Sequence, residues 1–143
     1  MAYVPHSFYH RMGTGEFNLS TDTLKLALYP AAAAATWAEA NAQDTDDLNY
    51  TATGESSGSG YTAGGATLTS VTWTEDDTGN KAVLDAADVV FSGASLTYRF
   101  AVIYDHTATN KAVISITDFG SDQVVSSTDL TFTMPAGGIL TIG

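Results

Sequence analysis

The sequence contains no cysteine and has few basic residues. The lack of cysteine excludes disulfide bonds, thiolate chemistry and zinc sites with cysteine ligands. Five lysines and arginines face sixteen aspartates and glutamates, which gives a formal net charge of −11 at pH 7. Such a charge repels the phosphates of nucleic acids and of anionic membrane surfaces, and it favours partners that carry basic patches. We therefore expect no nucleic-acid partner and no membrane partner.

Long apolar runs are also missing. The longest run, from Leu26 to Ala35, is interrupted by Pro30 and is too short to span a bilayer. The first residues contain no apolar core of the kind found in secretory signals, so we expect a soluble protein that does not use the general secretory route. A length of 143 residues, with 44% hydrophobic and 15% charged residues, is typical of one folded globular domain.

The clearest structural signal is the stretch from Leu96 to Asp105. Large apolar residues occupy every second position, which is the pattern of a strand with one buried face: Leu96, Tyr98, Phe100, Val102 and Tyr104. In the second half of the stretch, Ala101 and Ile103 make the opposite face apolar as well, which predicts a central strand covered on both sides.

Other short stretches alternate in the same way between turn residues. The first, residues 24–29, ends before Pro30, because proline cannot donate to a strand ladder. A change of parity between Leu68 and Val71 predicts a bulge near Thr69 within one strand. The further strands are expected over residues 81–84, 89–91, 112–119, 130–134 and 139–142, with a hairpin turn over 75–80. Together they predict an all-β fold, a β-sandwich or jelly-roll-like barrel of about eight strands.

Only one helix is expected, a short one over residues 31–42. Pro30 stands at its entrance, and the alanines favour helix. A helix of this length is marginal in water, so we expect Trp37 to hold it against the sheet. Residues 44–60 are expected to form a loop.

Residues 1–15 are aromatic and polar without a clear period, and we interpret them as an N-terminal arm. The arm would precede a single β-sandwich domain over residues 16–143. It either packs on its own domain or docks on a neighbouring subunit. The candidate partner contacts are Phe8, Tyr9, Arg11 and Met12, because large apolar and arginine side chains anchor interfaces.

One acidic loop partly matches a calcium-binding loop. Asp44, Asp46 and Glu55 have the spacing of ligands 1, 3 and 12. Leu48 and Asn49 stand where a ligand and a glycine belong, so we interpret the segment as a solvated acidic loop.

Two further groups include histidine. His6 and His10 are four residues apart, a spacing that suits a metal only on a helix, and Pro5 argues against a helix there. Asp105 and His106 adjoin at a strand end, but no serine lies in a nucleophile elbow. We therefore expect no catalytic, cofactor-binding or metal-binding residues, and no enzyme activity.

Arg99 is the only basic residue within the central strand. We expect it to form an ion pair with Asp118 or Asp105 on the less buried face. A contact with another subunit is the alternative interpretation.

Six short segments carry motifs that recur together in one family: Thr21–Leu28 (TDTLKLAL), Gly60–Leu68 (GYTAGGATL), Ala82–Val89 (AVLDAADV), Ala101–Asp105 (AVIYD), Asp118–Asp122 (DFGSD) and Gly137–Leu140 (GGIL). In their order and approximate spacing, from about residue 17 onward, the chain resembles a family of small structural virion proteins of tailed phages. The alanine run Ala31–Ala35 and the N-terminal arm depart from the family pattern, and partner contacts could differ there.

The resemblance implies a β-sandwich protein built into a phage particle. It favours a capsid decoration (cement) protein that binds the outside of the capsid and stabilises the shell, after synthesis in the host cytoplasm. The implied partners are the major capsid protein and neighbouring copies of the chain, with a trimer suited to three-fold positions. The negative charge suits the outer surface better than a DNA-filled interior.

Two other functions compete with capsid decoration. The first is a tail or fibre component that binds host surface glycans, with Trp37, Trp73 and the tyrosines stacking on sugar rings. The second is a polysaccharide hydrolase acting through Asp105 and His106, which the sequence disfavours.

Overall fold

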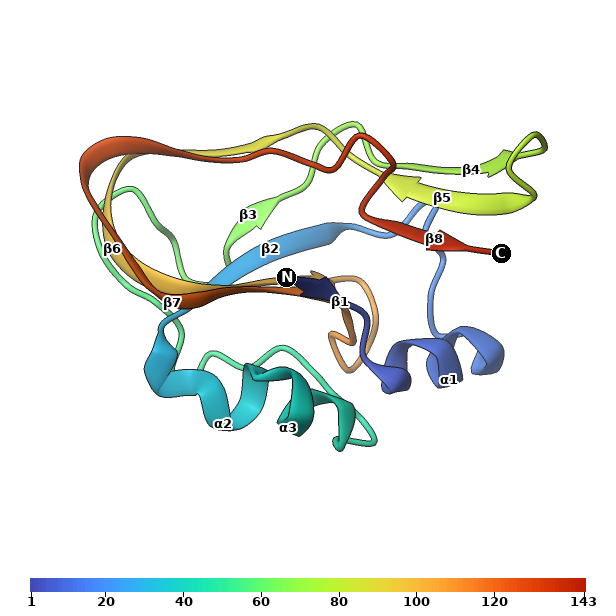
Figure 1. Cartoon of the computed structure of the whole chain (residues 1–143), viewed down its shortest axis with the longest axis horizontal. Coiled ribbons are helices and arrows are strands. Elements are labelled where there is room, and N and C mark those ends of the chain that lie inside the picture. The colour runs from blue at the N-terminus through green and yellow to red at the C-terminus, as the bar shows by residue number, and fades with distance from the viewer.

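The computed structural model describes all 143 residues and contains two antiparallel sheets (Figure 1). The five-stranded sheet has the order β1-β7-β6-β2-β3, and the three-stranded sheet has the order β4-β5-β8. This arrangement confirms the predicted all-β, sandwich-like fold with eight strands. The strands are β1 (Ala2–Tyr3), β2 (Leu24–Tyr29), β3 (Ala66–Thr67), β4 (Thr72–Asp76), β5 (Lys81–Asp85), β6 (Val89–Asp105), β7 (Val113–Phe132) and β8 (Leu140–Ile142).

The long hairpin of β6 and β7 bends over on itself and contributes to both layers (Figure 1). We call residues 100–105 and 113–118 the lower limb, and residues 89–98 and 123–132 the upper limb. The pairing Tyr98↔Gln123 is followed directly by Phe100↔Asp118, so the register breaks between the limbs. The lower limb belongs to the sheet with β1, β2 and β3, while the upper limb lies over it beside the three-stranded sheet (Figure 1).

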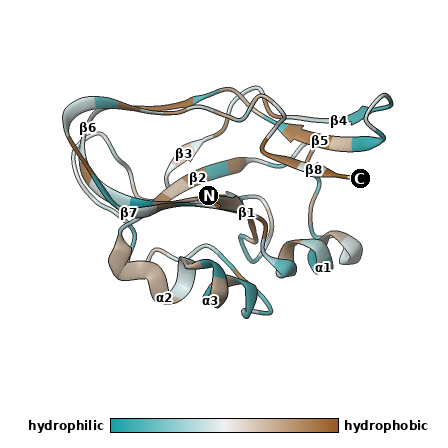
Figure 2. Ribbon diagram, viewed as in Figure 1, coloured by the Kyte–Doolittle hydropathy of each residue, from teal (hydrophilic) through white to brown (hydrophobic).

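The five-stranded sheet is buried on both faces. One face packs on a core of 17 buried residues shared with the upper limb and the three-stranded sheet, including Leu26, Leu84 and Ile114. The other face packs on a core of 10 buried residues that includes Phe100 and Trp37. Figure 2 shows that the tip of the β4–β5 hairpin is hydrophilic, whereas β8 is hydrophobic.

The helical segment after β2 covers the second face. It comprises a 3-10 turn (Ala31–Ala33), α2 (Ala34–Trp37) and α3 (Glu39–Gln43). The single helix predicted over 31–42 is thus broken, because Ala38 adopts an extended conformation with ψ 141°. Trp37 is fully buried and packs on Tyr29 with ring centroids 4.6 Å apart, which confirms that it holds this segment on the sheet.

The N-terminal segment packs on its own domain, as in the first of the two alternatives, and the expectation that Pro5 argues against a helix there was wrong. β1 extends the five-stranded sheet, and α1 (His6–Thr14) follows it. Pro5 directly precedes the first helical residue, where the missing N–H has no cost. At the other end Gly15 adopts a left-handed conformation, and its N–H and that of Glu16 bond to carbonyls of the last turn. Phe8 is fully buried in the sandwich core.

Two local predictions also need correction. The alternating residues of the central strand do not share one face: Leu96 and Tyr98 point into the sandwich core, whereas Phe100 points into the helix-side core. The phase changes at Arg99, whose guanidinium lies 4.8 Å from the ring centre of Phe100 on the same side. The strand expected over residues 66–73 is likewise not one bulged strand, because it divides into β3 and β4, which belong to different sheets.

Candidate functional site

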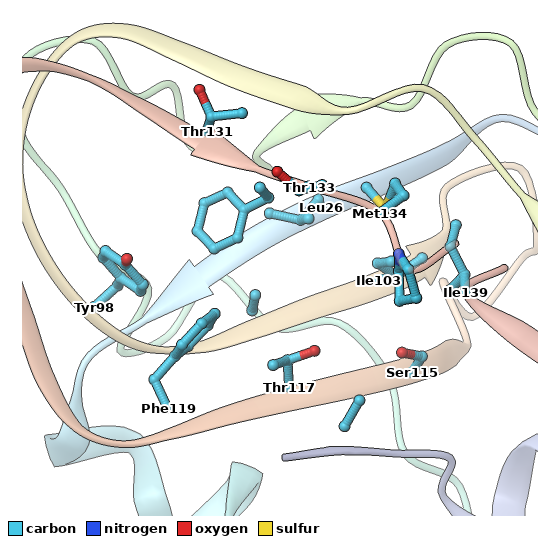
Figure 3. A pocket seen from close by; sticks show the side chains of 14 residues that line it. Leu26, Tyr98, Ile103, Ser115, Thr117, Phe119, Thr131, Thr133, Met134 and Ile139 are labelled. Atoms are coloured by element: carbon cyan, nitrogen blue, oxygen red, sulfur yellow. The ribbon is translucent and has the colours of Figure 1, made fainter. Parts of the chain in front are cut away.

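The pocket with the most hydrophobic lining lies between the two limbs of the bent hairpin (Figure 3). It has a volume of about 410 Å³, and nine of its fourteen lining residues are hydrophobic. Phe119 and Ile103 line its lower side and Met134 lines its upper side (Figure 3). Its polar groups are all hydroxyls, from Tyr98, Ser115, Thr117, Thr131 and Thr133, and no charged side chain lines it. The pocket therefore suits a neutral apolar group and offers no acid, base or metal ligand.

Asp105 and His106 do not form a catalytic pair. Asp105 is fully buried, and its Oδ1 accepts hydrogen bonds from the backbone N–H groups of Thr107 (2.9 Å) and Ala108 (3.0 Å). No hydrogen bond joins its carboxyl to His106, which is exposed. Burial, and next the neighbouring carboxyl of Asp22, raise the pKa of Asp105 to about 7. This carboxyl shapes the turn after β6 and is not available to solvent substrates.

The acidic residues of the loop do not converge on a cation. Asp44 and Asp46 are exposed. Glu55 instead accepts hydrogen bonds from the Tyr50 hydroxyl (2.8 Å), from the Tyr61 hydroxyl and from the Gly64 N–H (2.8 Å). Because those groups occupy both oxygens of Glu55, residues 44–55 do not form a calcium loop.

The two N-terminal histidines lie on a helix after all, since α1 places His6 and His10 one turn apart. Both line a polar pocket with Asp46 and Asp47. The chain contains no group of three or more histidine and acidic side chains placed to hold a metal ion. The helical spacing alone does not make a metal centre here.

The four candidate partner contacts divide into two buried and two accessible side chains. Phe8 and Arg11 are buried, and Arg11 donates to the Leu48 carbonyl (3.2 Å) and Asn49 Oδ1 (2.7 Å). These two therefore hold the chain's own loop and core, as in the first alternative for the segment. Tyr9 is 48% exposed and Met12 is half-buried, which leaves these two as the accessible members of the four candidates.

Arg99 forms the predicted ion pair with Asp118. Its Nε lies 2.8 Å from Oδ1 and its second amino group 3.0 Å from Oδ2, a bidentate arrangement. The hydrogen bonds from Arg99 lower the pKa of Asp118. The pair joins the two limbs where the hairpin bends, so its role is structural.

Acidic residues far outnumber basic ones on the molecular surface. Three of the five cations are engaged in ion pairs within the chain: Arg11 with Glu16 and Asp47, Lys81 with Asp76, and Arg99 with Asp118. Most of the sixteen acids have no cation within 4 Å. Such a surface attracts basic partners.

The aromatic residues offer little to a sugar. Trp37 is fully buried and Trp73 is half-buried. Tyr29, Tyr98 and Tyr104 are buried as well, and burial raises the pKa of Tyr104 to about 12. The stacking platform that motivated the glycan alternative is therefore largely inside the fold.

Comparison of the chain with protein-family models, with curated proteins and with solved structures gives no match. No helix in the fold has the length and apolar character needed to cross a membrane.

Two surface features were not found from the sequence: the pocket between the limbs and the unpaired edge of β7. Both arise from the bending of one hairpin. The shift in apolar phase around Arg99 is the one sequence signal that points to the bend.

Proposed function

We propose that this chain is a structural virion protein of a tailed phage, a capsid decoration protein that binds the outer shell surface. The observation that carries the proposal is the family resemblance of its six motif segments. Support comes from the contacts that the most specific segment, Gly60–Leu68, makes in the fold. The Tyr61 hydroxyl accepts from the Leu28 N–H (2.9 Å) and donates to Glu55. Gly65 has φ +80°, and a Cβ there would lie 1.9 Å from the Leu26 carbonyl oxygen.

These contacts explain why a motif of this kind specifies a scaffold. Only glycine fits at residue 65, because a side chain would collide with the backbone of β2. Tyr61 and Glu55 fix the loop that crosses that strand. A sequence motif whose residues serve to pack the backbone is expected of a structural protein.

The surface supports a role in binding basic protein surfaces outside the shell. Its partners would be the major capsid protein and neighbouring copies of the chain. Tyr9 and Met12 on α1 are accessible for such contacts. The predominance of uncompensated acids disfavours a position against packaged DNA.

The test mixes the purified chain with undecorated shells and images them by cryo-electron microscopy. We expect ordered density for the chain on the outer surface at symmetry-related positions. A parallel sample with the variants Tyr9→Ala and Met12→Ala measures whether α1 contributes to occupancy. Shells without ordered density, or density on the tail alone, would overturn the proposal.

A further inference from the structure

The upper limb leaves the outer side of β7 without a partner strand. On that side β1 covers only Ile116 and Thr117. From Gln123 to Phe132 β7 pairs only with β6, on its inner side, and residues 119–122 before it have no partner strand on either side. The N–H and C=O groups of such an edge are a template for a further strand.

This edge carries few of the features by which proteins block strand addition. Residues 119–132 contain no proline and no lysine. Its exposed side chains include Val124 and Thr131, which favour strands, and Val124 is 71% exposed. Three breaks in the register with β6, at residues 119–122, 126–127 and 129, bend the edge without covering it, and Ser127 in the second break has φ 48°.

Two exposed carboxylates mark the ends of the edge. Asp122 accepts the N–H of Ala31 (2.7 Å) and Asp129 accepts the N–H of Gly93 (2.8 Å). Neither has a cation within 4 Å. A strand added here is therefore favoured if it carries lysine or arginine near both ends.

A second copy of the chain fits this edge poorly. An antiparallel pair of β7 edges centred between Val125 and Ser126 would set Asp122 of one copy opposite Asp129 of the other. Like charges directly opposite one another destabilise strand pairs, and each copy carries a net charge of −11. The charge argues for a different, basic chain.

The edge also runs past the mouth of the apolar pocket. Thr131 lines the pocket from the upper limb, Thr133 lines it from just beyond β7, and Thr117 lines it from the lower limb (Figure 3). A strand paired with residues 124–132 would pass this opening. A large apolar side chain on that strand could enter the pocket, which adds specificity to backbone pairing.

We propose that the free edge of β7 binds an extended, basic segment of the shell subunit by strand addition, with one large apolar side chain in the pocket. The identity of the segment's source rests on the proposed function. Asp122 and Asp129 are seven positions apart, a span of roughly 20 Å along a strand. The segment then carries its basic residues about six or seven positions apart.

The test compares Val124→Lys with the matched variant Val90→Lys. Val124 lies on the free edge, whereas Val90, 51% exposed, lies on β6 of the same limb. Neither change removes a buried side chain. Binding is measured to undecorated shells and, separately, to a bead library of random dodecapeptides. We expect Val124→Lys to lose at least tenfold in binding to both, and Val90→Lys to bind like the wild type.

A second pair of variants tests the charge. Asp122→Asn and Asp129→Asn keep the acceptors for Ala31 and Gly93 and remove only the negative charges. The double variant should bind more weakly and show a smaller salt dependence. Peptides selected on the wild type should be enriched in lysine and arginine, and they should protect the amides of residues 121–132 from hydrogen exchange.

The outcomes separate this inference from the proposed function. If shells bind the wild type and Val124→Lys equally, strand addition is overturned and decoration stands. If the wild type does not bind shells, decoration and the shell origin of the segment fail together. The peptide library then tests strand addition at the edge independently of the shells. Peptides that bind the wild type and lose affinity for Val124→Lys support strand addition, and the absence of such peptides overturns it.

Discussion

The two limbs of the β6–β7 hairpin are the same pair of strands in different surroundings. In the lower limb Phe100 and Val102 are fully buried, because helices cover one face of the sheet and the sandwich core covers the other. In the upper limb Val90 and Val124 are exposed, because only the inner face is covered. The lower limb therefore stabilises the fold, while the upper limb leaves one face and one edge exposed.

The largest expected effect comes from opening a cavity under the lower limb. Phe100→Ala should lower the free energy of unfolding by about 3–5 kcal/mol, because it removes a buried ring from the helix-side core. Val124→Ala in the upper limb should change it by less than about 0.5 kcal/mol. Urea unfolding followed by tryptophan fluorescence measures both. Similar losses for the two variants would contradict the contrast between the limbs.

A comparable effect, dependent on pH, is expected at the end of the lower limb. The pKa of Asp105 is raised to about 7, so between pH 4 and pH 7 the folded state holds a proton that the unfolded state releases. The contribution of Asp105 to stability is present below pH 4 and is lost as the pH rises to 7. Asp105→Asn keeps the acceptor for Thr107 and Ala108 and has no carboxyl to ionise.

Relative to the wild type, Asp105→Asn should therefore be more stable at pH 8 than at pH 4, by a difference on the order of 4 kcal/mol. Paired urea titrations at the two pH values measure this difference. An equal difference between the two proteins at both pH values would show that Asp105 ionises normally in the fold.

The smallest effect is expected where the limbs meet. Arg99→Gln removes the cation that lowers the pKa of Asp118, so the urea midpoint at pH 7 should fall slightly. The contribution of Asp118 is present above its ordinary pKa near 4 and is lost as the pH falls through the lowered value. The difference between variant and wild type should therefore vanish in strong acid. A difference that persists there would mean that Arg99 acts through packing on Phe100 instead.

The strands were largely predictable because apolar residues recur at every second position in β2 and in the lower limb, where alternate side chains pack into the same core. The helix α1 was not predicted: Pro5 was taken as evidence against a helix, although it stands directly before the first helical residue and Gly15 supplies the end. The prediction that alternate residues of the central strand share one face was wrong at Arg99, because one shift in phase there moves the following side chains to the other core. The pocket and the free edge depend on how a single hairpin bends, and local patterns do not encode that bend.

The placement of β1 has a consequence for how the fold is completed during synthesis. Ala2 pairs with Thr117, and the Asp118 N–H donates to the Met1 carbonyl, so β1 must wait for partners that are synthesised much later. Pairings this distant in sequence raise the contact order and slow folding. Until the ribosome has released β7, the apolar face that β2 presents has no completed sheet around it. In that interval the net charge of −11 opposes aggregation, because like-charged chains repel one another.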